Sequence, residues 1–77
     1  MFEVLILSWF GEWLLLDEYP TQIGAEAEAR YAHRRSSSPV RVDHVDARTC
    51  TASTVTTLGD VSSYRRRCAT MFVPLGT

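Results

Sequence analysis

The sequence predicts an α+β fold, in which an antiparallel sheet of about four strands, in the order ββαββ, packs against one main helix. Three observations predict it: an apolar run interrupted by one glycine, then an alanine-rich stretch with helical spacing, then two β-branched stretches. The composition, 45% hydrophobic and 22% charged, is typical of a folded protein. A chain of 77 residues buries only a small core, so we expect residues 1–77 to form a single domain without a deep cleft.

The first 20 residues predict a β-hairpin. Apolar side chains occupy both faces of the first strand, from Phe2 to Leu7, which indicates a central strand that is buried on both sides or covered by an oligomer partner. Residues 10–12 contain Gly11 and supply a turn, and residues 13–16 are typical of a second strand. We expect this strand to end within residues 17–20.

A helix is predicted over residues 22–35, with Thr21 as its N-cap. The larger apolar side chains form one stripe on this helix. We expect three residues of this stripe to face the sheet: Ile23, Ala27 and Tyr31. A second side of the helix, where a close neighbour would fit, carries three small residues: Ala25, Ala29 and Ala32.

The second half of the chain predicts two more strands, over residues 40–46 and 49–57, the latter polar and suited to a sheet edge. From Asp60 onward two interpretations remain open, and we favour a second, C-terminal helix over a strand. The helix places five residues on one narrow arc: Val61, Tyr64, Cys68, Met71 and Phe72. Pro74 ends either element.

Charge is divided along the chain. Six carboxylates and no basic residue occur up to residue 28, whereas eight arginines and three aspartates follow from Arg30 onward. Within the helix this order opposes the macrodipole, because Glu26 and Glu28 precede a group of basic residues. That group comprises Arg30, Arg34 and Arg35. Helix electrostatics therefore explains the change of sign inside the helix but not the acidic residues before it.

Those earlier carboxylates, Glu12, Asp17 and Glu18, are expected to cluster around the end of the hairpin together with aromatic residues. The aromatic residues are Trp9, Phe10, Trp13 and Tyr19. Aromatic side chains ringed by carboxylates suit docking onto a basic protein surface, where the rings anchor and the charges steer. The alternative is that the two tryptophans are simply large core residues.

A group of arginines beside an aromatic residue offers a second interpretation of the charge pattern. Tyr64, Arg65, Arg66 and Arg67 stand together, and Arg30, Arg34 and Arg35 add to them. Guanidinium groups on phosphates and a ring stacked on a base would bind single-stranded nucleic acid. On a helix, consecutive residues point about 100° apart, so a solvated helix face is the simpler interpretation of the triplet.

No motif for catalysis or phosphate binding is present, and we expect neither an enzyme nor a cofactor. The candidates for a metal site stand alone in sequence rather than in close pairs, so we expect no metal. These candidates are His33, His44, Cys50 and Cys68. We expect the cysteines to be reduced thiols in the core and the histidines to lie at the surface. No apolar run approaches a membrane span and no export signal is recognisable, which predicts a soluble protein of the bacterial cytoplasm.

An acidic-faced α+β chain of this size without a catalytic motif resembles the small phage- and prophage-encoded proteins that inhibit bacterial defence, among them the anti-CRISPR proteins. The resemblance covers size, charge distribution and the order of sheet and helix over residues 2–57. It implies binding without catalysis, in which the protein docks on a CRISPR effector complex of the Cascade type and blocks target DNA from its basic channel. The contacts it would use are Glu12, Trp13, Asp17, Glu18, Tyr19, Glu26 and Glu28.

Two other classes of function stay open. A small nucleic-acid-binding accessory protein would use the arginines and Tyr64. A homo-oligomeric structural phage protein would use the apolar first hairpin. We expect a monomer or a small homo-oligomer, and direct nucleic-acid binding is the less favoured of the partner interactions.

Overall fold

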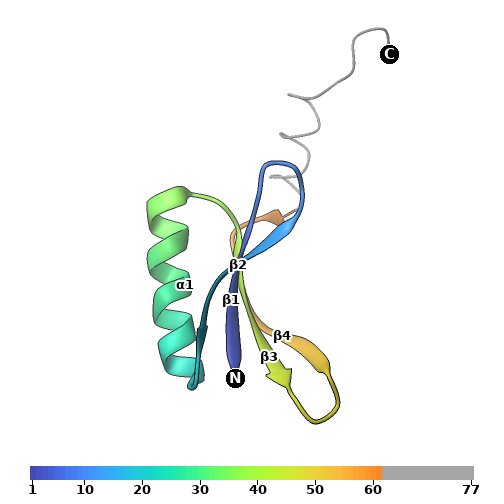
Figure 1. The fold of residues 1–77 in the computed structure, drawn as a ribbon. Coiled ribbons are helices and arrows are strands. Elements are labelled where there is room, and N and C mark those ends of the chain that lie inside the picture. Colours follow the sequence, from blue (N-terminus) through green and yellow to red (C-terminus); the bar gives the residue numbers. More distant parts are fainter. Residues whose placement is uncertain (62–77) are drawn as a thin grey trace, which may run out of the picture.

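Four strands and one helix follow one another in the predicted order ββαββ in the computed structural model, which describes residues 1–61 (Figure 1). The elements are β1 (Phe2–Leu7), β2 (Trp13–Tyr19), α1 (Gln22–Ser36), β3 (Val40–Asp46) and β4 (Thr51–Leu58). The element expected after Asp60, and Cys68 with it, lies outside the described residues. In the described part of the chain, the helix is not long and apolar enough to cross a membrane.

The strands form one antiparallel sheet in the order β2-β1-β3-β4, so β1 is central as predicted and β2 and β4 lie at the edges. The second strand is longer than expected, because it continues through Asp17 and Glu18 to Tyr19. Its register explains why: β1 pairs with it along its whole length, and Phe2 stands opposite Tyr19. Pairing with the central strand overrides the low strand preference of two successive carboxylates.

The helix faces the sheet with its small residues, and the predicted orientation is wrong. Ile23 is 80% exposed, and Tyr31 and Ala27 are exposed as well. The residues that pack against the sheet are instead Ala25, Ala29 and Ala32, together with Val4, Val40 and Val42 of the strands. The valines already fill the sheet surface, so a helix with small side chains can approach the sheet closely, whereas isoleucine and tyrosine would hold it away.

Local signals set the ends of α1. The Thr21 hydroxyl accepts a hydrogen bond from the Gly24 N–H at 3.2 Å, as expected of an N-cap. A Cβ at position 24 would lie 3.1 Å from the same hydroxyl oxygen, which is closer than an ordinary van der Waals contact. The close cap therefore explains why a glycine occurs inside this helix. At the other end Ser37 adopts a left-handed conformation (φ 61°), and its N–H donates to the His33 carbonyl.

Only one face of the sheet is covered by a helix within residues 1–61 (Figure 1). Phe2, Val4 and Ile6 alternate toward α1 and join or flank the core. Leu5 projects to the other face, where it stands opposite Leu15 and is half-buried. Leu7 projects to the same face and is 1% exposed, so the expectation that β1 is buried on both sides holds at Val4 and Leu7 but not at Leu5.

Two matched substitutions test the orientation of α1. Ala29→Leu should destabilise the protein by about 1–3 kcal/mol, because it overfills the contact with the valines. Ala27→Leu adds the same side chain to the exposed side and should change the free energy of unfolding by less than about 0.5 kcal/mol. Urea unfolding of both variants measures the difference, and equal midpoints would contradict the alanine-faced packing.

Candidate protein-binding site

The β2 edge, which we define as residues Trp13–Tyr19, exposes a run of three apolar side chains. Leu14, Leu15 and Leu16 are 49%, 52% and 43% exposed, respectively. Because β2 is an edge strand in the described sheet, one side of its backbone has no strand beside it. An apolar edge of this kind is a template for pairing with another chain.

A β-bulge interrupts this edge at Leu16. Leu5 stands opposite Leu15 and Val4 opposite Asp17, so Leu16 is the extra residue. The other edge strand has the same feature, because Val55 is passed over between the partners of Val42 and Asp43. Both edges thus carry a half-exposed aliphatic residue at a bulge, which sharpens the local twist of each strand.

Carboxylates follow the leucines toward the end of β2. Asp17 is exposed, and its Oδ1 accepts a hydrogen bond from the Glu18 N–H at 2.8 Å. Directly opposed residues share a face of the sheet. Asp17, opposite Val4, therefore lies on the face that α1 covers, whereas Glu18, opposite Glu3, lies on the other face. The end of this strand presents negative charge on both faces.

Tyr19 brings the strand and the helix together. Partial burial raises the pKa of its phenol, and the carboxylates of Glu28 and Asp17 raise it further, both by their charge and by hydrogen bonding. Three of the predicted contact residues thus lie together where β2 meets α1: Asp17, Tyr19 and Glu28. They form a small acidic surface around a half-buried aromatic ring.

Glu12 and Glu26 are separated from that surface. Glu26 is turned toward β4, where a hydrogen bond from Thr56 is the main cause that lowers its pKa. Glu12 lies in the hairpin turn, about 20 Å along the strand from Glu18 at roughly 3.3 Å per residue. The expected single cluster of aromatic residues and carboxylates is therefore wrong, because the length of β2 divides it.

The aromatic residues divide in the same way. Trp9 and Phe10 contact each other in the exposed turn, with ring centroids 4.9 Å apart and the ring planes tilted by 47°. Trp13 is half-buried and lies under the guanidinium of Arg41, 4.6 Å from the ring centroid. Neither tryptophan is a core residue, so that alternative is wrong too. Trp13 is available at the start of the β2 edge as a partly exposed aromatic residue.

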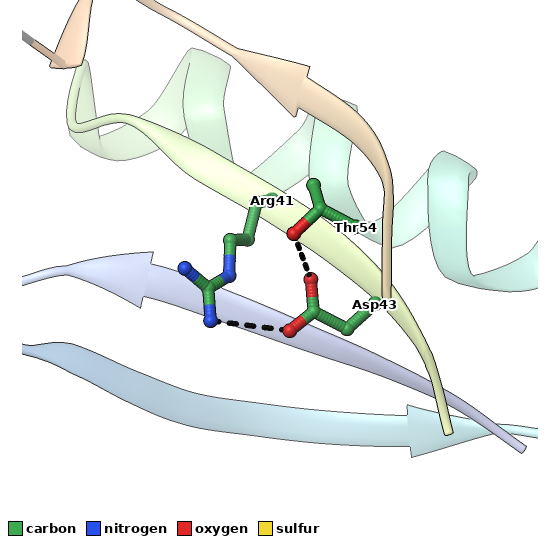
Figure 2. A network of polar contacts seen from close by, with 3 residues as sticks. All are labelled: Arg41, Asp43 and Thr54. Carbon is green, nitrogen blue, oxygen red and sulfur yellow. Dashed lines mark hydrogen bonds and ion pairs between the residues drawn. The ribbon is translucent and has the colours of Figure 1, made fainter. Parts of the chain in front are cut away.

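A polar network that the sequence analysis missed fixes Arg41 in this position (Figure 2). Arg41 Nη2 lies 3.1 Å from Asp43 Oδ2, and the Thr54 hydroxyl donates to Asp43 Oδ1 at 2.8 Å. The three side chains lie on the face of the sheet away from α1. Asp43 is only 5% exposed, so its two partners satisfy a buried charge. The alternation of valine with Arg41 and Asp43 was the available signal, since residues two apart share a face.

Three of the five arginines within residues 1–61 lie elsewhere, on α1. Arg30, Arg34 and Arg35 are exposed on α1, and the last two lie in its final turn, where cations oppose the macrodipole. Arg35 also lies over the ring of Tyr31, 5.2 Å from its centroid. Tyr64, Arg65, Arg66 and Arg67 lie outside the described residues, so the structure does not place the predicted nucleic-acid site as a whole.

Residues suited to metal binding or nucleophilic chemistry are dispersed within residues 1–61, where no three His, Cys, Asp or Glu side chains form a metal-binding group. His33 Nδ1 lies 2.8 Å from the Ser38 carbonyl oxygen, and His44 packs against Phe2. Cys50 is a free, exposed thiol in the turn between β3 and β4, so its expected place in the core is wrong.

In comparisons with known proteins, no family model, no curated protein and no solved structure matches this chain. The function must therefore be argued from the chemistry of the β2 edge and its surroundings.

Replacing Glu28 with glutamine tests the convergence at Tyr19. Loss of that charge should lower the pKa of Tyr19 toward its ordinary value of 10.0, without reaching it, because partial burial is the larger cause. NMR titration of the tyrosine ring measures the shift. Glu18→Gln, on the opposite face, is the matched control and should leave the Tyr19 pKa unchanged. An unchanged pKa in Glu28→Gln would contradict the described geometry.

Proposed function

We propose that this chain is a non-catalytic protein-binding domain that docks through the β2 edge onto a partner with a basic surface. One observation carries the proposal: half-exposed Leu14, Leu15 and Leu16 run directly into the exposed carboxylates of Asp17 and Glu18 on an edge strand. The leucines supply apolar area to bury, and the carboxylates supply charge for steering and register.

The chemistry of such a surface favours a protein over a nucleic acid. Phosphate groups would be repelled by Asp17, Glu18 and Glu28, whereas arginine and lysine side chains of a protein would be attracted. Trp13 and Tyr19 stand at the two ends of the strand and provide partly buried rings as anchors. The surface therefore combines apolar anchors with a negative flank.

The class of partner follows from the resemblance to small inhibitors of bacterial defence. A CRISPR effector complex that holds its target DNA in a basic channel offers a surface of the required charge. Binding there would exclude DNA by occupying the channel, and it would require no chemical step. We therefore propose an anti-CRISPR-like inhibitor of a Cascade-type complex.

Charge reversal on β2 tests this function. Asp17→Lys combined with Glu18→Lys should reduce binding to an immobilised Cascade-type complex by at least about tenfold, because it turns steering into repulsion. Arg34→Glu with Arg35→Glu reverses the same number of charges on α1 and should leave binding intact. Thermal unfolding of each variant first establishes that it folds.

Three outcomes would overturn the proposal. Failure of the parent protein to bind the complex would remove the proposed target. If both charge variants lost binding affinity equally, the β2 edge would not be the contact surface. Loss of function confined to the arginine variant, together with a gel shift of DNA by the parent, would establish the nucleic-acid alternative instead.

A further inference from the structure

We infer that the β2 edge binds its partner by strand addition, and that the added strand is a short basic segment of another protein. The inference rests on the proposed function and specifies the mode of binding and the chemistry of the partner. Its central observation is that an edge strand carries apolar and acidic residues in separate halves.

The backbone of β2 supports the mode of binding. β1 pairs with one side of this strand from Trp13 to Tyr19, so alternate N–H and C=O groups point away from the described sheet. An extended segment laid along that side would satisfy them as a fifth strand. In strand addition, these main-chain hydrogen bonds give affinity and the side chains on alternate faces give specificity.

The two edges of the sheet are not equivalent. On β4 the hydroxyls of Thr54 and Thr56 are held by Asp43 and Glu26, and the strand Thr51–Leu58 carries no charge of its own. Val55 is its one exposed large apolar residue, at 42%. The β2 edge instead offers three such residues and two carboxylates, which selects it as the site of addition.

Charge complementarity identifies the occupant. Asp17 and Glu18 project to opposite faces of the sheet, so a partner strand with two consecutive basic residues places one of them beside each carboxylate. Apolar residues in the rest of that strand would lie beside the leucines. A second copy of this chain fits poorly, because pairing two β2 strands brings four like charges into one short ladder.

The bulge limits the length of the added strand. Leu16 breaks the regular alternation in the middle of β2, so regular pairing is possible over only a few residues on either side of it. We therefore expect a short recognition segment whose binding weakens as salt screens the charges. The bulge also provides a place where a substitution disturbs the edge without touching the core.

Two synthetic peptides test the mode of binding directly. The first has the sequence Val-Thr-Val-Thr-Val-Arg-Arg-Thr. The second is the same peptide with alternate backbone nitrogens methylated, which keeps the side chains and removes the N–H donors along the edge that would face β2. NMR titration should show the first peptide binding at β2 and protecting its outward amides from exchange. The methylated peptide should bind at least about tenfold more weakly.

Matched variants test the location. Leu16→Arg and Val55→Arg place the same side chain at the bulge of each edge strand, at positions of nearly equal exposure (43% and 42%). Leu16→Arg should reduce binding of the first peptide by about tenfold, through repulsion and lost apolar contact. Val55→Arg should leave it unchanged, and thermal unfolding checks that both variants fold.

The outcomes separate this inference from the proposed function. Equal binding of both peptides, with Asp17→Lys and Glu18→Lys still abolishing it, would overturn strand addition and leave acidic docking in place. If the first peptide changed the NMR chemical shifts of β4 instead of those of β2, the choice of edge would be overturned. A concentration-dependent dimer in sedimentation, lost in Leu16→Arg, would make a second copy the occupant and overturn the basic partner.

Discussion

The contact between the alanine side of α1 and the valines of the central strands is the interaction on which the rest of this structure depends. Ala25, Ala29 and Ala32 add little apolar area themselves, but their size lets the helix lie close over Val4 and Val42. Dense packing of this kind contributes dispersion contacts that larger, poorly fitting side chains would lose. The core is therefore thin, and it is built over β1 and β3 rather than over the edges.

This placement of the helix leaves β2 with an exposed apolar surface. A small chain has few elements with which to cover its sheet, and α1 covers one face of it within residues 1–61. Exposed leucines on an edge strand usually promote aggregation. Here the bulge at Leu16 and the carboxylates of Asp17 and Glu18 oppose pairing of like with like. In the proposed function the same features would admit a partner of opposite charge, so protection and specificity would have one physical origin.

Sequence reasoning succeeded where local chemistry decides the structure. Thr21 as the helix cap, Gly11 in the hairpin turn with a positive φ of 85°, and the order of strands and helix along the chain were all predictable, because each depends on a few neighbouring residues. The orientation of α1 was not, because apolar volume favoured Ile23 and Tyr31, whereas the fit to the sheet favoured alanine. The fit of the helix to the sheet depends on the valines that it packs against. Those valines are distant in sequence from the helix, so the helix sequence alone does not predict the fit.

The candidate site was predictable in part for the same reason. Asp17, Glu18 and Tyr19 were recognised from charge and aromatic character, but the length of β2, set by its pairing with β1, separated them from Glu12. The network around Asp43 depends on contacts between β3 and β4 and gave only a faint signal in the sequence.

Native-state hydrogen exchange on the full chain tests the central claim of a thin core with an open β2 edge most directly. Backbone amides of β1, β3 and the buried side of α1 should exchange only through global unfolding, whereas the β2 amides that point away from β1 should exchange much faster. That pattern would show the core and the free edge together. Outward β2 amides as slow as those of β1 would contradict the account, because the edge would then already be covered.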